Sequence, residues 1–170
     1  MKKRAFTSFI SILFAVMALS QPSLLWESSF NGAVANDQGN AIAIDGSGNV
    51  YVAGATDETS GASDYLTIKY NANGDILWSR TYNGAANGLD EALAIKVDAA
   101  GNVYVTGRSQ GTGSAFNIVT IKYNSDGVQQ WAVVINNGLV NIGNNLVVDP
   151  FGNVYVAGGN NAYNGHIIVK

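Results

Sequence analysis

Three aspartates recur at nearly equal spacing, each in a short loop that also carries Gly and Asn. Asp98 lies 53 residues after Asp45, and Asp149 lies 51 residues after Asp98. Oxygen atoms in such loops are ligands that Ca²⁺ accepts, but a calcium loop needs several alternating carboxylates. Each loop here has one, and Pro150 and Phe151 replace two possible ligands in the third. The pattern favours structural turns, and we expect no metal site.

Two further rows of residues recur at the same period and could bind a ligand. The polar row is Asp37, Asp90 and Asn141, with Glu91 beside it; because it loses its carboxylate in the third copy, it favours a solvated loop. The aromatic row has one Trp per repeat. An exposed aromatic ring in each repeat can stack on sugars, but a periodic Trp in a sheet packed on both faces is more often core. All seven are retained as candidate ligand-binding residues: Asp37, Asp90, Glu91, Asn141, Trp26, Trp78 and Trp131.

Residues for catalysis are scarce in this chain. His166 is the only histidine and there is no cysteine, so a nucleophile with its base, or a histidine metal site, would rest on one residue. No phosphate-binding loop of the G-x-x-x-x-G-K-[ST] kind is present. The sequence therefore predicts a protein that is not an enzyme and uses no cofactor.

The aspartate loops belong to a longer repeat that predicts β-strands. Asp-x-x-Gly-Asn-Val-Tyr-Val occurs at 45–52, 98–105 and 149–156, a period typical of stacked arrays. Apolar runs on both sides of each loop predict a hairpin, in which Gly48 takes positive φ and Asp45 bonds turn amides. A second hairpin is predicted around Asn73-Gly74 and Asp126-Gly127. Strands apolar on both faces, such as 50–53, suit a sheet sandwiched between neighbouring sheets; Lys69 and Lys122, inside such strands, are expected to extend to an edge.

These residues resemble a known repeat. The run D-x-x-G-N-V-Y-V-[AT]-G, then [IL]-x-I-K-Y-N, then Trp and an aromatic-Asn-Gly is similar to the SBBP family of bacterial β-propeller repeats. The matching segments are Asp45 to Gly54, Leu66 to Asn71, Trp78, Tyr82-Asn83-Gly84, Asp98 to Gly107, Val119 to Asn124 and Trp131. The resemblance implies propeller blades of four antiparallel strands. It also implies a structural scaffold on exported proteins, with no common catalytic residues.

The repeats divide the chain into about three blades' worth of an all-β propeller. We expect the last strand of one blade at 24–32, complete blades at 39–84 and 92–138, and an incomplete blade at 142–170. Three blades fall below the four to eight of known rings. Either several chains assemble a ring, or the chain is part of a longer propeller. The end at Lys170, inside a predicted strand, favours the second interpretation, and both imply exposed sheet faces and an unpaired edge.

The N-terminus is typical of a secretory signal peptide. Lys2, Lys3 and Arg4 precede a mostly apolar run from Ala5 to Leu19, too short for a confident membrane span. Removal of residues 1–20 would leave 12 acidic and 6 basic side chains, which disfavours nucleic acid or anionic lipid as a partner. An uncleaved anchor is the alternative. We expect a protein that is secreted or held in the cell envelope, without stable membrane insertion after cleavage.

These patterns predict an exported scaffold that binds protein or has a structural role at the cell envelope. The alternative is a lectin-like propeller that binds carbohydrate. Buried Trp side chains would favour the scaffold, and exposed ones around a shared groove would favour the lectin. The expected partners are a protein or glycan at the cell surface and, for ring closure, further copies of the chain or the remainder of a longer propeller.

Overall fold

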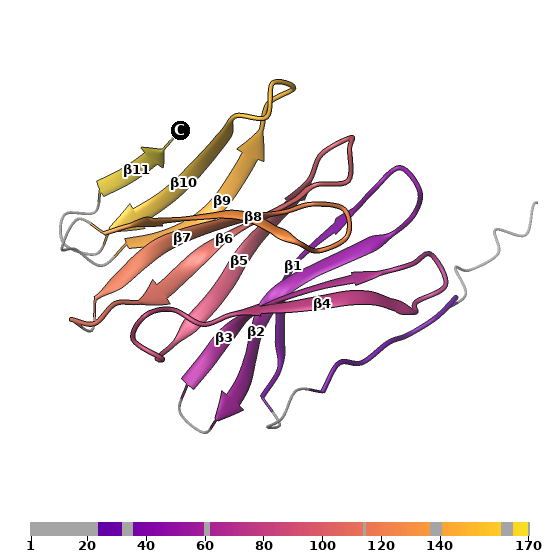
Figure 1. Ribbon diagram of the computed structural model, residues 1–170, viewed down its shortest axis with the longest axis horizontal. Helices are drawn as coiled ribbons and strands as arrows, with labels where there is room; N and C mark the ends of the chain where they lie inside the picture. The colour runs from indigo at the N-terminus through magenta and orange to yellow at the C-terminus, as the bar shows by residue number, and fades with distance from the viewer. Residues whose placement is uncertain are drawn as a thin grey trace, which may run out of the picture.

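Three antiparallel sheets stand side by side with their faces packed together (Figure 1). The computed structural model describes residues 24–31, 36–59, 62–113, 115–136, 141–160 and 165–169. Blade 1 is β1 (Gln38–Ile44), β2 (Val50–Thr59), β3 (Ala62–Tyr70) and β4 (Ile76–Tyr82). Blade 2 is β5 (Asp90–Val97), β6 (Val103–Gln110), β7 (Phe116–Tyr123) and β8 (Gln129–Ile135). Blade 3 is β9 (Asn141–Val148), β10 (Val154–Asn160) and β11 (Gly165–Val169), and the predicted all-β blade architecture is confirmed.

The strands of each blade follow one another in chain order, and the first strands of the three blades are neighbours. β1 contacts β5, and β5 contacts β9, so the inner strands line one side of the array and β4 and β8 form its outside. Residues 24–31, where a blade's last strand is predicted, form no strand. A strand needs a neighbouring edge for its ladder, and the described chain places no third strand of the same blade beside this segment.

Both predicted types of hairpin turn are present, each with a glycine at positive φ. The first hairpin of each blade turns at Gly48, Gly101 or Gly152, with φ of 80°, 81° and 82°. The second hairpin turns at Gly74 (φ 88°) in blade 1 and at Gly127 (φ 76°) in blade 2. Glycine adopts this left-handed backbone without the steric cost of a Cβ, so the predicted hairpins and the predicted positive φ of Gly48 are confirmed.

The glycine that ends the repeated Val-Tyr-Val-[Ala/Thr]-Gly run has a different role. In blade 2 it is Gly107, which lies opposite a shift of register on β5 between Ala92 and Ala94. A Cβ added to Gly107 would lie 2.9 Å from the Cα of Ala92 and closer still to the carbonyl oxygen of Glu91. Glycine is therefore required because the bulged inner strand approaches the backbone of its neighbour.

Two layers of the core lie between blades, and a smaller third cluster, of Leu66, Ile68 and Tyr70, is buried on the face of blade 1 turned away from blade 2. Between blades 1 and 2, fully buried Tyr51 and Tyr65 pack with Val105 and Ile121. Between blades 2 and 3, Tyr104 and Ile118 pack with Leu146 and Val156. Tyr104 and Val105 are adjacent in sequence and point to opposite faces, yet are 1% and 0% exposed. Blade 2 is thus apolar on both faces, as predicted for a sandwiched sheet.

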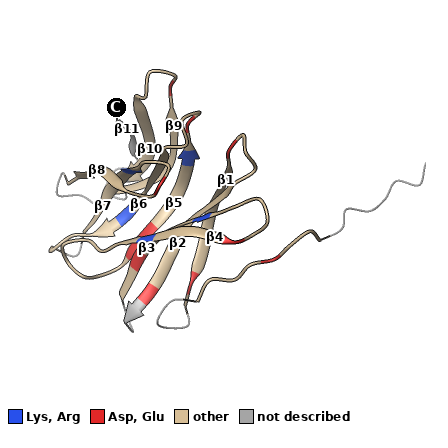
Figure 2. Cartoon of the chain, turned by 45° about the vertical axis from the view of Figure 1, so that its right-hand side comes forward, with Lys and Arg blue, Asp and Glu red and all other residues tan. Residues whose placement is uncertain are grey.

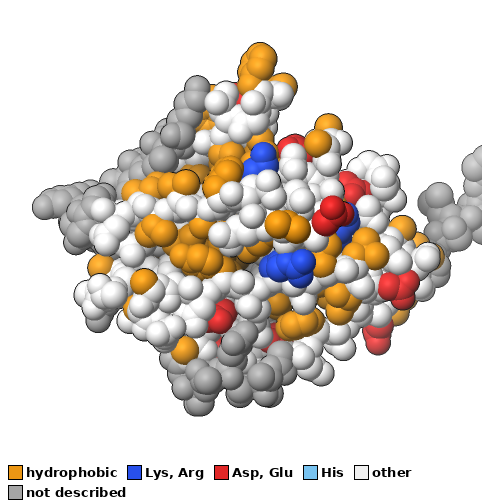
Figure 3. All heavy atoms as spheres, in the orientation of Figure 1, with side chains coloured by type: hydrophobic (Ala, Val, Ile, Leu, Met, Phe, Trp, Pro, Cys, Tyr) orange, Lys and Arg blue, Asp and Glu red, His pale blue; other side chains and the backbone are white. Residues whose placement is uncertain are grey.

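Hydrophobic side chains also reach the surface over the outer strand β8, on the side shown in Figure 3. They include Val133 and Val134, each 50% exposed. No described residue belongs to a helix that is long and apolar enough to span a membrane. The predicted signal peptide, residues 1–20, lies outside the described part of the chain.

Candidate functional site

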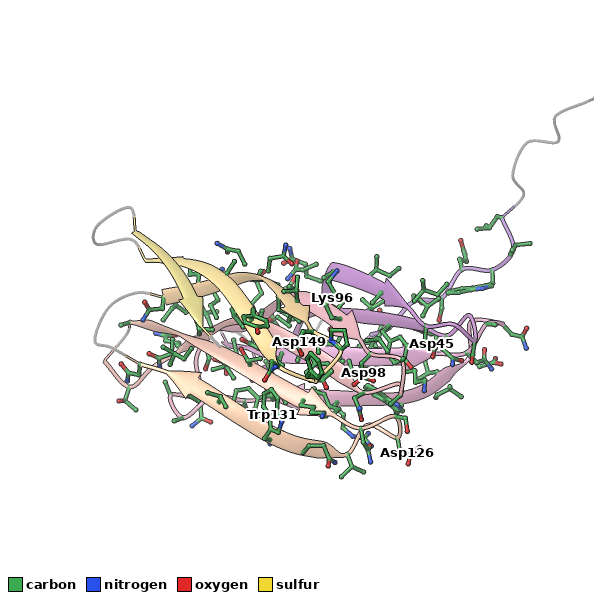
Figure 4. All side chains as sticks on the ribbon, turned by 90° about the horizontal axis from the view of Figure 1, so that it is seen from above. Asp45, Lys96, Asp98, Asp126, Trp131 and Asp149 are labelled. Atoms are coloured by element: carbon green, nitrogen blue, oxygen red, sulfur yellow. The ribbon has the colours of Figure 1, made fainter. Side chains whose placement is uncertain are left out.

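The three repeated aspartates form one hydrogen-bonded turn, built three times (Figure 4). In the first, one carboxylate oxygen of Asp45 accepts bonds from the backbone N–H groups of Ser47 (2.8 Å) and Asn49 (3.0 Å). The other accepts bonds from the Asn49 side-chain amide (2.8 Å) and the Tyr51 hydroxyl (2.9 Å). Asp98 and Asp149 accept the same four bonds at 2.7–3.3 Å. Each carboxylate therefore locks its turn, as the sequence predicts.

These bonds also set the acidity of the turn aspartates. Burial acts to raise the pKa of Asp45, but the bonds from Asn49, Tyr51 and Ser47 together outweigh it and lower the pKa to about 2. The pKa of Asp98 is lowered by the same balance. For Asp149 the Asn153 amide is the largest cause of a lowered pKa. The carboxylates thus remain ionised acceptors inside their own turns at neutral pH.

The second polar row lies where the inner strands begin. Asp90 is fully buried, and its carboxylate accepts bonds from the backbone N–H groups of Gly84 (2.5 Å) and Gln110 (3.1 Å). It therefore ties the connection between blades 1 and 2 to the end of β6. Asn141 is fully buried at the start of β9, and Asp37 lies partly exposed just before β1. The structure thus places each member of this row at the entrance of its own blade.

Each tryptophan packs on a tyrosine ring, and Trp78 and Trp131 do so at the contacts between neighbouring blades. Trp78 is 8% exposed and lies between Tyr51 of its own blade and Tyr123 of the next, with ring centroids 6.2 and 6.1 Å away. Trp26 packs on Tyr70 at 6.2 Å, and Trp131, labelled in Figure 4, packs on Tyr104 at 6.2 Å. Trp26 and Trp131 are half-buried.

The turn between β7 and β8 is held by blade 1. Trp78 donates its indole N–H to the Ser125 carbonyl oxygen (3.1 Å), and Lys69 donates to the same oxygen (3.2 Å). Arg80 donates to the Gly127 carbonyl oxygen at 2.7 Å. Lys69 is 9% exposed, so the expectation that it extends to a solvent edge is wrong: the turn of the next blade supplies its acceptor.

A polar hollow of about 210 Å³ opens between blades 1 and 2, at the end of the strands opposite the aspartate turns. We call this end the connection rim, because the chain passes there from one blade to the next. Figure 2 shows acidic residues gathered near it, around the lower ends of β2 and β3. The residues that line the hollow are Asn36, Gln38, Ala55, Asp57, Ser63, Leu89, Glu91 and Arg108.

An ion pair forms one wall of this hollow. The Nη2 atom of Arg108 lies 2.7 Å from the Oε2 atom of Glu91, and the Nε atom of Arg108 donates to the same oxygen at 2.9 Å. The two residues face each other across β5 and β6. Asn40 of blade 1 donates to the Oε1 atom of Glu91 at 3.0 Å, and Asn36 donates to Asp57 at 3.0 Å. The hollow thus combines one cation, two carboxylates and amides at a junction of two blades.

Comparison with known families agrees with this geometry. A family model described as SBBP, a β-propeller repeat, matches residues 30–62, which include β1 and β2. The chain carries an SBBP β-propeller repeat. No curated protein matches the chain.

The ion pair of the hollow departs from the chain's own repeat. Where blade 2 has Glu91, the matched positions of blades 1 and 3 have Gln38 and Ile142. Where it has Arg108, they have Ala55 and Gly159. Sequence reasoning proposed Glu91 but missed Arg108, Asn40 and Asp57. The departure of Arg108 from its own repeat, and its place opposite Glu91 in the β5–β6 hairpin, were the signals that could have found it.

A larger hollow lies at the other end of the array of blades, with a volume of about 640 Å³. It separates the β5–β6 turn from the β9–β10 turn and is bordered by Lys96, Asp98 and Asp149 (Figure 4). Both carboxylates already accept the four bonds of their turns. Within the described ranges, no three His, Cys, Asp or Glu side chains gather as a metal site.

Proposed function

We propose that this chain is an exported, non-catalytic β-propeller scaffold of the cell envelope that binds a protein partner at the connection rim between blades 1 and 2. The observation that carries the proposal is the Glu91–Arg108 pair, whose side chains are 16% and 36% exposed in an open hollow. Such a pair adds only about 0–1 kcal/mol to stability. Folding alone therefore gives little reason for two charges at positions that are uncharged in blades 1 and 3.

The surroundings of the pair suit a protein contact. Arginine is enriched at protein interfaces, where its planar group makes several directed hydrogen bonds. Leu89 lies at the same hollow and is 45% exposed, so an apolar contact is available beside the charges. Asn40 holds Glu91 in place from the neighbouring blade. A partner would thus meet a preorganised polar surface, which reduces the entropy lost on binding.

The absence of catalysis is supported by how the carboxylates are used. Asp45, Asp98 and Asp149 are each bonded inside a turn, Asp90 is buried as a link between segments, and Glu91 is ion-paired. Export is supported by the basic and apolar pattern of the first 20 residues.

A glycan is the second candidate ligand. The amides, hydroxyl and carboxylates of the hollow can bond sugar hydroxyls. The burial of Trp78 supports protein over sugar, because a ring packed between two tyrosines presents no face for stacking.

Site-specific photo-cross-linking in the producing cell tests the proposal. A photoreactive amino acid is placed at Leu89 in the hollow or, as the control, at Val128 in the turn at the opposite end; both positions are exposed. We expect a discrete protein adduct from position 89 only, and its loss in the Arg108→Ala variant. No adduct from position 89, or equal adducts from both positions, would contradict the proposal. Binding to a glycan array that Arg108→Ala abolishes would replace protein by glycan as the ligand.

A further inference from the structure

The two end sheets of the array expose faces that are buried wherever a neighbouring blade is present. On blade 1, the face turned away from blade 2 carries Ile42, which is 72% exposed. The matched residues Ile95 in blade 2 and Leu146 in blade 3 are 4% and 1% exposed, because each is covered by the preceding blade. We call this surface of blade 1 the head face. Ile42 and Ile44 are its exposed residues, and Val50 and Val52 are half-buried. Leu66 and Ile68 lie beneath them and are buried, with Phe30 of segment 24–31 packed against their cluster.

Blade 3 exposes the complementary surface, which we call the tail face: Val147, Tyr155 and Ala157. Ala157 is exposed, whereas its matched residues Ala53 and Thr106 are 0% exposed under the following blade. Val147 is 56% exposed. The chain has two internal interfaces, one between blades 1 and 2 and one between blades 2 and 3. In each, the face of one blade that matches the tail face packs on the face of the next blade that matches the head face. The two outer faces of the described array therefore carry the two halves of an interface that the array already builds twice.

The segment 24–31 lies on the head face in the manner of a blade's last strand. The ring of Trp26 lies on Tyr70, and a Cβ added to Gly74 would come within 2.8 Å of that ring. Trp78 lies in the same way on Tyr123, and a Cβ on Gly127 would come within 2.7 Å of it. Beside the segment, a hollow of about 290 Å³ remains open over the head face. That hollow is where the other strands of such a blade would pack.

We propose that the tail face of one copy of this chain docks on the head face of a second copy. Segment 24–31 of the second copy then lies along β11, the edge strand of blade 3, and supplies that blade's fourth strand, with Trp26 against the first copy's Tyr155. The contact is heterologous, so each copy offers one face of each kind and two copies can close a ring. The ring has six blades, within the range of known propellers. Closure also covers the β11 edge, which would otherwise be open to uncontrolled pairing.

The mass of the full chain, purified as the expressing cell processes it, tests this proposal by light scattering after gel filtration. At about 50 μM we expect one species with twice the mass of the chain. Ile42→Glu on the head face and Ala157→Glu on the tail face place a carboxylate in the docked interface. Each is expected to weaken association at least 100-fold. Both positions are exposed in the single chain, so circular dichroism should show a folded protein. Val134→Glu, at a position of the outer strand β8 that is 50% exposed, is the control that keeps the two-copy mass.

Mixing the two variants distinguishes the head-to-tail contact from other modes. A ring made of one variant alone has two contacts, and each of them contains a substituted face. In a mixed pair, the native tail face of the Ile42→Glu copy meets the native head face of the Ala157→Glu copy, so one contact is fully native. We expect the mixture to regain the two-copy mass. The proposal would be overturned by any of three results. The wild-type chain could be monomeric, its two-copy mass could persist in both variants, or the mixture of variants could stay monomeric. A folded wild-type monomer would assign the head and tail faces to further blades or to another protein.

Discussion

The indole N–H of Trp78 donates a hydrogen bond to the carbonyl oxygen of Ser125, 3.1 Å away in the next blade. Lys69 and Arg80 bond the same turn from the same side. Three donors of blade 1 thus fix the β7–β8 turn of blade 2, and the ring of Trp78 covers Gly127 at its centre. A glycine is needed there for two reasons, its positive φ and the closeness of the ring.

Gly127→Ala separates these two reasons when it is compared with Gly152→Ala. Both glycines have positive φ, 76° and 82°, so both substitutions cost about 1–2 kcal/mol of backbone strain. Only at position 127 does the new Cβ meet a side chain; nothing lies within 4 Å at position 152. We expect Gly127→Ala to lower the free energy of unfolding by a further 1–3 kcal/mol or so, measured by urea denaturation. Equal losses would mean that Trp78 does not press on the turn.

Gly107→Ala tests the close approach of strands at the bulge of blade 2. The added Cβ would run into the backbone of β5, which cannot move without breaking the ladder. We expect a loss of about 1–3 kcal/mol or more in the free energy of unfolding. Gly113→Ala is the matched control, because nothing lies within 4 Å of that position, and it should change stability by less than about 0.5 kcal/mol. A small effect of Gly107→Ala would show that the bulge relaxes.

Substitution of Asp90 measures the link between blades 1 and 2. Asp90→Ala leaves the buried N–H group of Gly84 without its acceptor, whereas the N–H group of Gln110 keeps the carbonyl oxygen of Leu89. We expect a loss of about 1–3 kcal/mol in the free energy of unfolding, measured by urea denaturation. Asp90→Asn retains an oxygen acceptor, and Asn stands at the matched position 141 of blade 3, so its effect should be clearly smaller. If both variants lose the same stability, the negative charge rather than the acceptor holds the connection.

The Asp45 turn predicts a defined dependence of stability on pH. The pKa of Asp45 is about 2 in the folded chain against an ordinary value of 3.8, so folding favours the ionised form. The stability that wild type gains over Asp45→Asn is therefore fully present above pH 3.8 and is lost as the pH falls toward 2. Urea denaturation of both proteins across this range measures the difference, with Asp126→Asn, at an exposed turn position, as the control. A difference that does not vary with pH would contradict the assigned bonds.

What the sequence could predict depended on the distance over which each interaction acts. The turn of Asp45 and Gly48 was predictable, because all its partners lie within six residues. The buried position of Lys69 was not, because its acceptor Ser125 is 56 residues away and belongs to another blade. Of the strand predicted at 24–32, the described residues 24–31 form no strand, since a ladder depends on a neighbouring edge and not on the segment's own pattern.

The candidate site was only half predictable for a related reason. Glu91 lies next to Asp90, which belongs to a row that repeats along the chain, so the period of that row indicated this part of the sequence. Arg108 has no counterpart in the other blades, and pairs with Glu91 only once β5 and β6 are aligned. Residues that build every blade can be identified from the sequence because they repeat. A pair that occurs in only one blade can be identified only once the register of its strands is known.

The central claim is that repeated residues build the array while the unrepeated Glu91–Arg108 pair binds a partner. The most direct test measures two quantities on the Arg108→Ala variant: the free energy of unfolding and the yield of the adduct from a photoreactive residue at position 89. We predict a stability within about 1 kcal/mol of wild type and loss of the adduct. Asp98→Asn, the control in a repeated turn, should do the reverse. An Arg108→Ala protein that keeps the adduct, or that unfolds, would contradict the account.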